Sequence, residues 1–215
     1  MAEPQSSLIE NIERHQLMVA VRTDTAQEAY NAAVACIAGG IKFIEITFSV
    51  PGADSVIGDL IADSRVTVGA GTVLNLEDAR KALKAGASYL VSPNCDEEII
   101  GFTKKEGLLS IPGACTPTEI YRAYKAGADI VKIFPFVQMG GLEFLKEIRG
   151  PLPFIRYMIA GGANLDNICD YRAARVSCIL LGSAIIKREY VKAAQWKLIT
   201  DLAKELVQKV SEFTQ

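Results

Sequence analysis

The chain has 215 residues, of which half are hydrophobic, and its 23 basic and 25 acidic residues give a net charge of −2. This length favours a single domain over residues 1–215, and the near-neutral charge gives no sign of a nucleic-acid partner. No run of about 18 apolar residues is long enough to cross a membrane. The N-terminus lacks the basic and then apolar pattern of a signal peptide, so we expect a cytoplasmic protein.

Cysteine and histidine usage argues against a disulfide framework, a metal site or a histidine-based catalytic triad. The five cysteines are scattered, odd in number and without a CxxC pair, which is typical of incidental thiols in a reducing compartment. His15 is the only histidine and lies in a polar segment, where a solvated helix position is the simpler interpretation. We therefore expect neither a metal nor a cofactor.

The chain repeats one pattern, in which a short apolar run precedes a helical segment. The first segment, 6–15, is predicted to form an amphipathic helix. Continuous apolar runs are typical of parallel strands that are buried on both faces. They predict strands at 17–21, 41–47, 66–70, 88–92, 108–111, 129–134, 154–159 and 177–181. Helices are predicted between them at 23–38, from Pro51, at 75–86, up to 107, at 116–127, 141–148 and 164–173, and finally at 189–213.

Eight such strand–helix units without a long insertion predict a closed (β/α)₈ TIM barrel with an extra N-terminal helix. The alternative is an open, doubly wound sheet. It usually has fewer strands, and no G-x-G-x-x-G motif follows the first strand here. We find no linker or second domain in the sequence.

Lys132 lies in the middle of an apolar predicted strand. Burying an ammonium group without a partner costs several kcal/mol unless the group loses its proton. Lys132 is therefore either a residue at a strand end that reaches solvent or a functional amine. Strand alternation places Lys132 and Phe134 on the same face of the strand at 129–134. It likewise places Phe43, Glu45 and Thr47 on one face of the strand at 41–47.

In a TIM barrel the carboxyl ends of the strands form the active site, and both Glu45 and Lys132 approach that end. One interpretation is a structural ion pair. The other is an amine nucleophile that forms a Schiff base with a ketone, assisted by a carboxylate that transfers protons. That chemistry needs no metal.

Glycines follow the seventh and eighth predicted strands, at Gly161-Gly162 and at Gly182-Ser183. Loops at these two positions form the usual phosphate site of TIM barrels, and glycine lets backbone N–H groups approach an anion closely. Ordinary turn glycines are the alternative for either pair alone. Because glycines follow both the seventh and the eighth strand, a phosphate site is the favoured interpretation.

The sequence resembles the KDPG/KHG aldolase family, that is, 2-keto-3-deoxy-6-phosphogluconate and 4-hydroxy-2-oxoglutarate aldolases. The resemblance covers nearly the whole chain, and it is carried in order by residues 44–47, 69–74, 91–93, 111–113, 131–135, 161–162 and 182–183. It implies a class I aldolase, commonly a homotrimer, with Lys132 as the Schiff-base lysine and Glu45 as the acid/base residue.

The resemblance also implies a substrate site. Thr72 would contact the carboxylate of a 2-keto acid, and Pro93 and Phe134 would line the substrate channel. The phosphate would be held by Gly161, Gly162 and Ser183.

Two positions depart from the family pattern. Many members carry an arginine shortly after the glutamate, where this chain has Thr47-Phe48-Ser49-Val50. Arg22, at the end of the first predicted strand, is the cation that we nominate to bind the carboxylate instead. Ala160 replaces a threonine that many members have before the two glycines, which leaves the preferred aldehyde partner open.

We therefore expect reversible cleavage of a 2-keto-4-hydroxy acid to pyruvate and an aldehyde. The candidates are the 6-phosphorylated sugar acid, which gives glyceraldehyde 3-phosphate, and 4-hydroxy-2-oxoglutarate, which gives glyoxylate. The rival function is a phosphosugar isomerase or synthase on the same barrel, acting without an imine.

Overall fold

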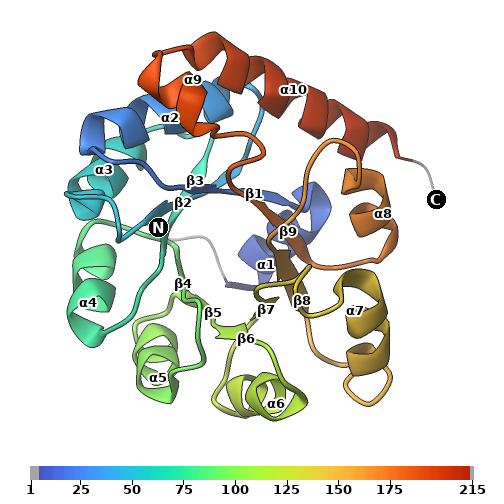
Figure 1. Cartoon of the computed structure of the whole chain (residues 1–215). Helices are drawn as coiled ribbons and strands as arrows, with labels where there is room; N and C mark the ends of the chain where they lie inside the picture. Colours follow the sequence, from blue (N-terminus) through green and yellow to red (C-terminus); the bar gives the residue numbers. More distant parts are fainter. Residues whose placement is uncertain (1–4, 214–215) are drawn as a thin grey trace.

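The chain folds into a barrel of parallel strands enclosed by a ring of helices, described by a computed structural model over residues 5–213 (Figure 1). The strands are β1 (Leu17–Val21), β2 (Phe43–Thr47), β3 (Thr67–Gly71), β4 (Tyr89–Val91), β5 (Leu109–Ile111), β6 (Gly113–Ala114), β7 (Val131–Ile133), β8 (Tyr157–Ala160) and β9 (Cys178–Leu181). They form one sheet in the order β5-β4-β3-β2-β1-β9-β8-β7-β6. The predicted TIM barrel is thus confirmed.

The structure has nine strands where eight were predicted, because the short strand β6 follows the predicted fifth strand. β5 and β6 are separated only by Pro112, which has no N–H to donate to a neighbouring strand. The Pro112 carbonyl still accepts a hydrogen bond of 2.9 Å from the backbone nitrogen of Lys132. The two ends of the sheet therefore meet at this proline, and the barrel closes there.

The helices follow the strands as predicted, although several of them begin later than expected: α2 begins at Ala26 rather than Thr23, and α3 at Ala53 rather than Pro51. They are α1 (Gln5–His15), α2 (Ala26–Ala38), α3 (Ala53–Leu60), α4 (Leu76–Lys84), α5 (Glu97–Lys105), α6 (Pro117–Lys125), α7 (Gly141–Arg149), α8 (Ile168–Ala173), α9 (Arg188–Lys192) and α10 (Trp196–Glu212).

The prediction of one long C-terminal helix is wrong, because the chain turns between α9 and α10, where Ala194 has a φ of +50°. α8 begins at Ile168 rather than at Asn164, because Asn164 takes part in a hydrogen-bonded turn with Asn167. Likewise β8 begins at Tyr157, because residues 154–156 form a loop. No helix in the described part is long and apolar enough to cross a membrane.

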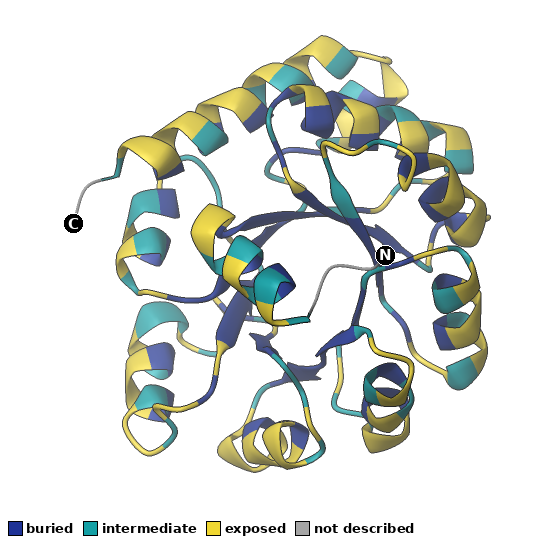
Figure 2. Ribbon diagram, turned by 180° about the vertical axis from the view of Figure 1, so that it is seen from behind, coloured by how far each residue is buried: buried dark blue, intermediate teal, exposed yellow. Residues whose placement is uncertain are grey.

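Helix α1 closes the amino-terminal end of the barrel, as Figure 2 shows from behind. Its buried Leu8 and Ile12 join a cluster that fills the barrel interior, with Met18, Phe43, Tyr89, Val91, Leu109, Ile111, Ile130, Met158, Ala160, Cys178 and Leu180. This dry layer lies below the carboxyl ends of the strands. Any pocket at the opposite end therefore has an apolar floor.

Asp129 fixes the start of the strand that carries Lys132. Its carboxylate accepts hydrogen bonds from Lys104 Nζ at 2.6 and 2.7 Å and from the backbone nitrogen of Ser110 at 2.8 Å. The same ammonium donates to Gln5 Oε1 at 3.0 Å. The Asp129 carboxylate thus links the segment before β7 to β5 and α5. Through Lys104 it also links this segment to α1.

We expect Asp129→Ala to lower the free energy of unfolding by about 2 kcal/mol, because a half-buried ammonium and a backbone N–H would both lose their acceptor. Urea denaturation measures the change. Asp201→Ala is the matched control, since Asp201 forms an exposed pair with Lys197 one helical turn away and should change stability by less than about 0.5 kcal/mol. Equal losses in the two variants would contradict this role of Asp129.

Candidate active site

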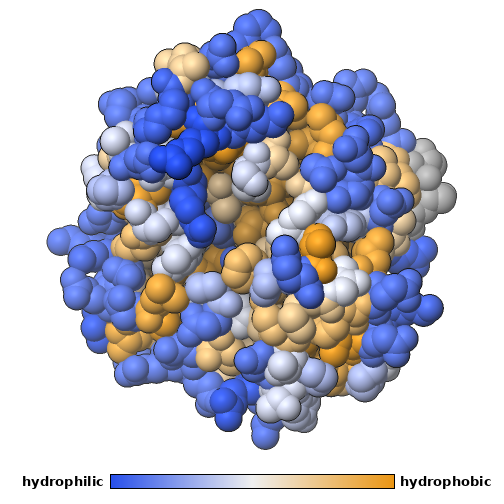
Figure 3. Space-filling model, in the orientation of Figure 1, coloured by the Kyte–Doolittle hydropathy of each residue, from blue (hydrophilic) through white to orange (hydrophobic). Residues whose placement is uncertain are grey.

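A cavity of about 950 Å³ opens at the carboxyl ends of the strands. Figure 3 shows it as a hollow near the centre of this face, with hydrophobic residues at its base. The cavity is lined by all ten residues that the sequence nominated, namely Arg22, Glu45, Thr72, Pro93, Lys132, Phe134, Gly161, Gly162, Gly182 and Ser183. The fold thus brings together positions that lie between residues 22 and 183 of the sequence.

Lys132 is the central residue of β7, and only 7% of its surface is exposed. Burial lowers the pKa of its amine; Glu45 opposes this shift and Arg22 adds to it. Nζ lies 5.1 Å from the centre of the Phe134 ring, which is partly exposed at the cavity wall. The amine therefore faces the cavity with an aromatic ring beside it, and it does not extend to bulk solvent.

Glu45, in β2, is 1% exposed, and its Oε2 has no hydrogen-bond partner. Burial raises the pKa of this carboxyl group, against the opposing effects of Lys132 and Arg22. Within the described residues, Lys132 and Glu45 form no direct ion pair with each other or with any other group. The structure thus shows two buried groups on one cavity, each shifted toward its neutral form, rather than a closed salt bridge.

Two glycines of β3 make room for large side chains inside the barrel. A Cβ on Gly71 would lie 2.7 Å from Cδ of Glu45, and one on Gly69 would overlap the ring of Tyr89. Tyr89 donates a hydrogen bond of 2.7 Å to the Ile44 carbonyl, next to Glu45 in β2. The position of the carboxylate is therefore set by the absence of a side chain on the adjacent strand.

Arg22 lies on the cavity wall and donates a hydrogen bond of 3.2 Å to the Thr72 hydroxyl. Thr72 has a φ of +56°, in the left-handed region that a β-branched residue rarely occupies. The Ser49 hydroxyl is hydrogen-bonded to Thr47 at 2.9 Å. The guanidinium bonded to Thr72 thus comes from the residue that directly follows β1.

The loops after β8 and β9 form another part of the wall. Gly161 and Gly162 have φ values of +101° and +87°, which glycine adopts without strain. The side-chain amides of Asn164 and Asn167 donate to the Gly162 carbonyl at 3.3 and 2.8 Å. These bonds fix that carbonyl, so the loop is held in one conformation before any ligand arrives.

Sequence reasoning missed a group of charged residues at the rim. Lys192 of α9 pairs with Asp24 and Glu28 at 2.9 Å each, and Arg188 lies 3.5 Å from Asp24. All four line the cavity. No local pattern marks them, because they come together only when α9 packs against the start of α2, more than 160 positions earlier.

The described residues contain no group of three or more His, Cys, Asp or Glu side chains that could hold a metal ion. The buried titratable groups on this cavity are the Lys132 amine and the Glu45 carboxyl group, and Arg22 is close enough to shift the pKa of both. An arrangement of this kind suits covalent chemistry on a carbonyl compound.

The sequence model of the family "KDPG and KHG aldolase" matches residues 8–202. The chain belongs to this family. It is therefore an aldolase, and aldolases are lyases.

Relatives in this aldolase family match over most of their length. The 2-dehydro-3-deoxy-phosphogluconate aldolase of Treponema pallidum (strain Nichols) is 31% identical, with 95% of this chain and 98% of that protein aligned. The KHG/KDPG aldolase of Escherichia coli (strain K12) is 30% identical, over 85% and 86%. The two names differ in the substrates they imply.

Solved structures agree with the sequence comparison. KDPG aldolase from Legionella pneumophila, with pyruvate captured at low pH as a covalent carbinolamine, superposes with a TM-score of 0.83. It is 29% identical, covering 91% of this chain and 95% of that one. A 3-hexulose-6-phosphate synthase superposes with a TM-score of 0.70 but at 19% identity, which shows the shared fold alone.

We expect Gly71→Ala to lower aldol cleavage by roughly 10–100-fold while the fold is retained, because the new methyl group would displace the Glu45 carboxylate. Steady-state kinetics and circular dichroism measure the two effects. Gly58→Ala is the control, since a Cβ at this position in α3 meets nothing within 4 Å. Unchanged turnover in Gly71→Ala would show that the carboxylate position does not matter.

Proposed function

We propose that this aldolase works through a Schiff base on Lys132, with Glu45 as its acid/base residue. The observation that carries the proposal is the buried Lys132 amine with its lowered pKa, on the same cavity as a buried carboxyl group that forms no ion pair. A neutral amine is a nucleophile, whereas a protonated one is not. The covalent carbinolamine of the Legionella relative supports the same chemistry here.

The reaction begins when the Lys132 amine attacks the ketone carbon of a 2-keto-4-hydroxy acid. The resulting carbinolamine gains a proton on its hydroxyl group and loses water, which leaves a protonated imine. Glu45, with its raised pKa, holds a proton at neutral pH more readily than an ordinary glutamate and can supply it.

Cleavage follows when the Glu45 carboxylate removes the proton of the C4 hydroxyl group. The C3–C4 bond breaks, its electron pair moves into the imine to form an enamine, and C4 leaves as an aldehyde. Protonation of the enamine at C3 and addition of water then release pyruvate and the free amine. The buried floor of the cavity limits access of water to the enamine.

The remaining lining residues are proposed to bind the substrate. Arg22 and Thr72, already hydrogen-bonded to each other, lie on the wall nearest Glu45 and suit the keto-acid carboxylate. Pro93 and Phe134 would line the channel. The glycines at 161, 162 and 182, together with Ser183, would hold a phosphate at the other part of the wall.

The substrates proposed are 2-keto-3-deoxy-6-phosphogluconate and 4-hydroxy-2-oxoglutarate, separately or together. The glycine loops favour the phosphorylated acid. Ala160 removes a hydroxyl group that many relatives place beside this loop, so the unphosphorylated acid stays a candidate. Comparison of kcat/KM for the two substrates decides between them.

The rival proposal, a phosphosugar isomerase or synthase, would use the phosphate loops without an imine. It explains neither the burial of Lys132 nor the pKa shift of its amine. The likeness to a hexulose-phosphate synthase concerns the fold alone, and the family match favours the aldolase.

We also propose that the protein is a homotrimer in the cytoplasm. Resemblance to the family supports the trimer, and the half-exposed aromatic side chains of Tyr121, Tyr124 and Phe154, which pack on one another, are consistent with a subunit contact. All five cysteines are free, which suits a reducing compartment. Light scattering measures the number of subunits.

We expect borohydride to trap pyruvate on Lys132, because burial lowers the pKa of its amine and so increases the unprotonated fraction relative to an exposed lysine. Mass spectrometry of peptides locates the adduct, and trapping should increase with pH until the pKa of Lys132 is passed. Lys132→Met should give no adduct. Glu45→Gln should still form the adduct while turnover falls at least about 100-fold; an adduct on another lysine would reject the mechanism.

We expect Arg22→Ala to raise KM for the 2-keto acid about tenfold or more, since a charge-assisted hydrogen bond to the carboxylate would be lost. The matched control is Arg188→Ala, which removes an arginine from the same cavity at its rim. Unchanged KM and unchanged pyruvate trapping in Arg22→Ala would reject this role.

A further inference from the structure

The loop between β8 and α8, residues 161–167, forms part of the wall of the catalytic cavity. Residues 161–164 line this cavity, whereas Asn167 does not. The backbone N–H groups of residues 161–163 donate to no acceptor within the part of the chain that the structure describes. Such groups can form charge-assisted hydrogen bonds to an anionic ligand, provided that they point toward it.

The Asn167 side chain is turned back toward this loop instead of capping its own helix. Asn167 is the N-cap residue of α8, where an asparagine side chain usually accepts a hydrogen bond from the first helical turn. Here it forms no such bond. Its Oδ1 accepts from the backbone nitrogen of Asn164 at 2.9 Å, and its Nδ2 donates to the Gly162 carbonyl at 2.8 Å. Both polar atoms of the side chain are therefore bonded to the loop.

The bond to the Gly162 carbonyl fixes the direction of the next N–H group. The peptide bond between residues 162 and 163 is trans, since the one cis bond in the described part of the chain precedes Pro135. In a planar trans peptide the C=O and N–H groups point in opposite directions. The Gly162 carbonyl is directed at Asn167, so the Ala163 N–H is directed away from it.

The orientation of this peptide depends mainly on Asn167. Gly162 packs against the loop after β7, so closely that a Cβ on Gly162 would overlap the Val137 side chain, but this contact does not hold the carbonyl. The carbonyl accepts from the side-chain amides of Asn164 and Asn167, at 3.3 and 2.8 Å. The bond from Asn167 is the shorter of the two, and this residue lies off the cavity that Ala163 lines.

We propose that Asn167 is a positioning residue that turns the Ala163 N–H into the cavity, where it donates to the phosphate of the aldehyde substrate. Asn167 itself does not touch the substrate. The inference rests on the proposed function, because it requires the aldehyde half of the substrate to lie beside this loop. It goes further by committing the site to a phosphorylated aldehyde and by naming the residue that orients one of the phosphate donors.

The test compares the condensation of pyruvate with glyceraldehyde 3-phosphate and with unphosphorylated glyceraldehyde. Asn167→Ala should raise KM for glyceraldehyde 3-phosphate about tenfold, as expected for the loss of one charge-assisted hydrogen bond. KM for glyceraldehyde and borohydride trapping of pyruvate on Lys132 should not change, because neither ligand carries a phosphate. Asn167→Leu, which keeps the approximate size of the side chain without its polar atoms, should give the same result and guards against an effect of lost packing.

The matched control is Asn75→Ala. Asn75 is the N-cap residue of α4, and its side chain does cap that helix, accepting from the backbone nitrogen of Asp78 at 2.8 Å. Loss of this cap should lower Tm by about 3 °C and leave KM for both aldehydes unchanged. The control thus separates the loss of an N-cap asparagine from the loss of a bond to the loop.

An unchanged KM for glyceraldehyde 3-phosphate in Asn167→Leu would overturn the inference. An equal rise for both aldehydes would also overturn it, since it would show a general structural role. If the unaltered protein binds the two aldehydes equally well, the inference fails while pyruvate trapping on Lys132 leaves the Schiff base in place. Absence of a pyruvate adduct in the unaltered protein is a different result, because it rejects the proposed function together with this inference.

Discussion

The burial of one amine beside one carboxyl group is the constraint on which the rest of this structure depends. Lys132 and Glu45 lie on strands at different places in the barrel, and both are almost wholly removed from solvent. In such surroundings each charged form is costly, so the pKa of the lysine falls and that of the glutamate rises. A direct salt bridge would remove this effect. The space between the two groups keeps it and leaves room for a substrate.

That arrangement needs a barrel interior with space in particular places. β3 provides it by carrying glycine at positions 69 and 71, against which Tyr89 and Glu45 pack. Tyr89 and the apolar side chains around it fill the barrel below the pair, and α1 closes the lower end. The dry surroundings of Lys132 are therefore built largely by residues below the cavity, such as Tyr89, Leu8 and Ile12, which do not line it.

Much of the fold and most of the cavity could be predicted from the sequence because the signals are local. Apolar runs and a lysine within a strand each have a direct physical meaning, and strand ends in a closed barrel converge by geometry. The sequence reasoning failed for two different reasons. The rim pairs of Lys192 depend on residues more than 160 positions earlier in the chain, which no local pattern reports. The turns at Ala194 and Asn164 are local, but the helical pattern of the surrounding residues did not reveal them.

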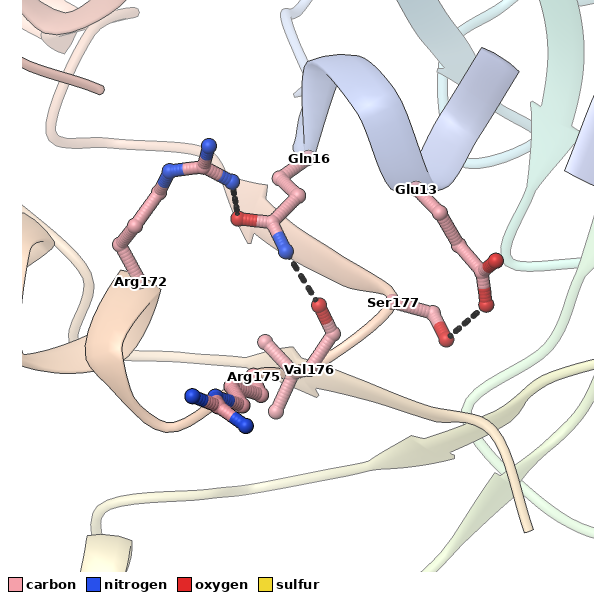
Figure 4. Close-up of a pocket in the computed structure, with 6 residues that line it drawn as sticks. All are labelled: Glu13, Gln16, Arg172, Arg175, Val176 and Ser177. Carbon is pink, nitrogen blue, oxygen red and sulfur yellow. Dashed lines mark hydrogen bonds between the residues drawn. The ribbon is translucent and has the colours of Figure 1, made fainter. Parts of the chain in front are cut away.

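The carboxyl end and the amino end of the barrel are built differently, and sequence reasoning predicted a cavity only at the carboxyl end. At the carboxyl end, strand alternation places Lys132 and Glu45 on one cavity. At the amino end, a smaller cavity of about 330 Å³ is formed by loops, with Gln16 in a left-handed conformation and a turn held by Arg149 (Figure 4). The Gln16 amide there donates to the Val176 carbonyl, 160 positions away in the sequence. No local pattern of residues reports a contact between segments so far apart, which is why sequence reasoning missed this end.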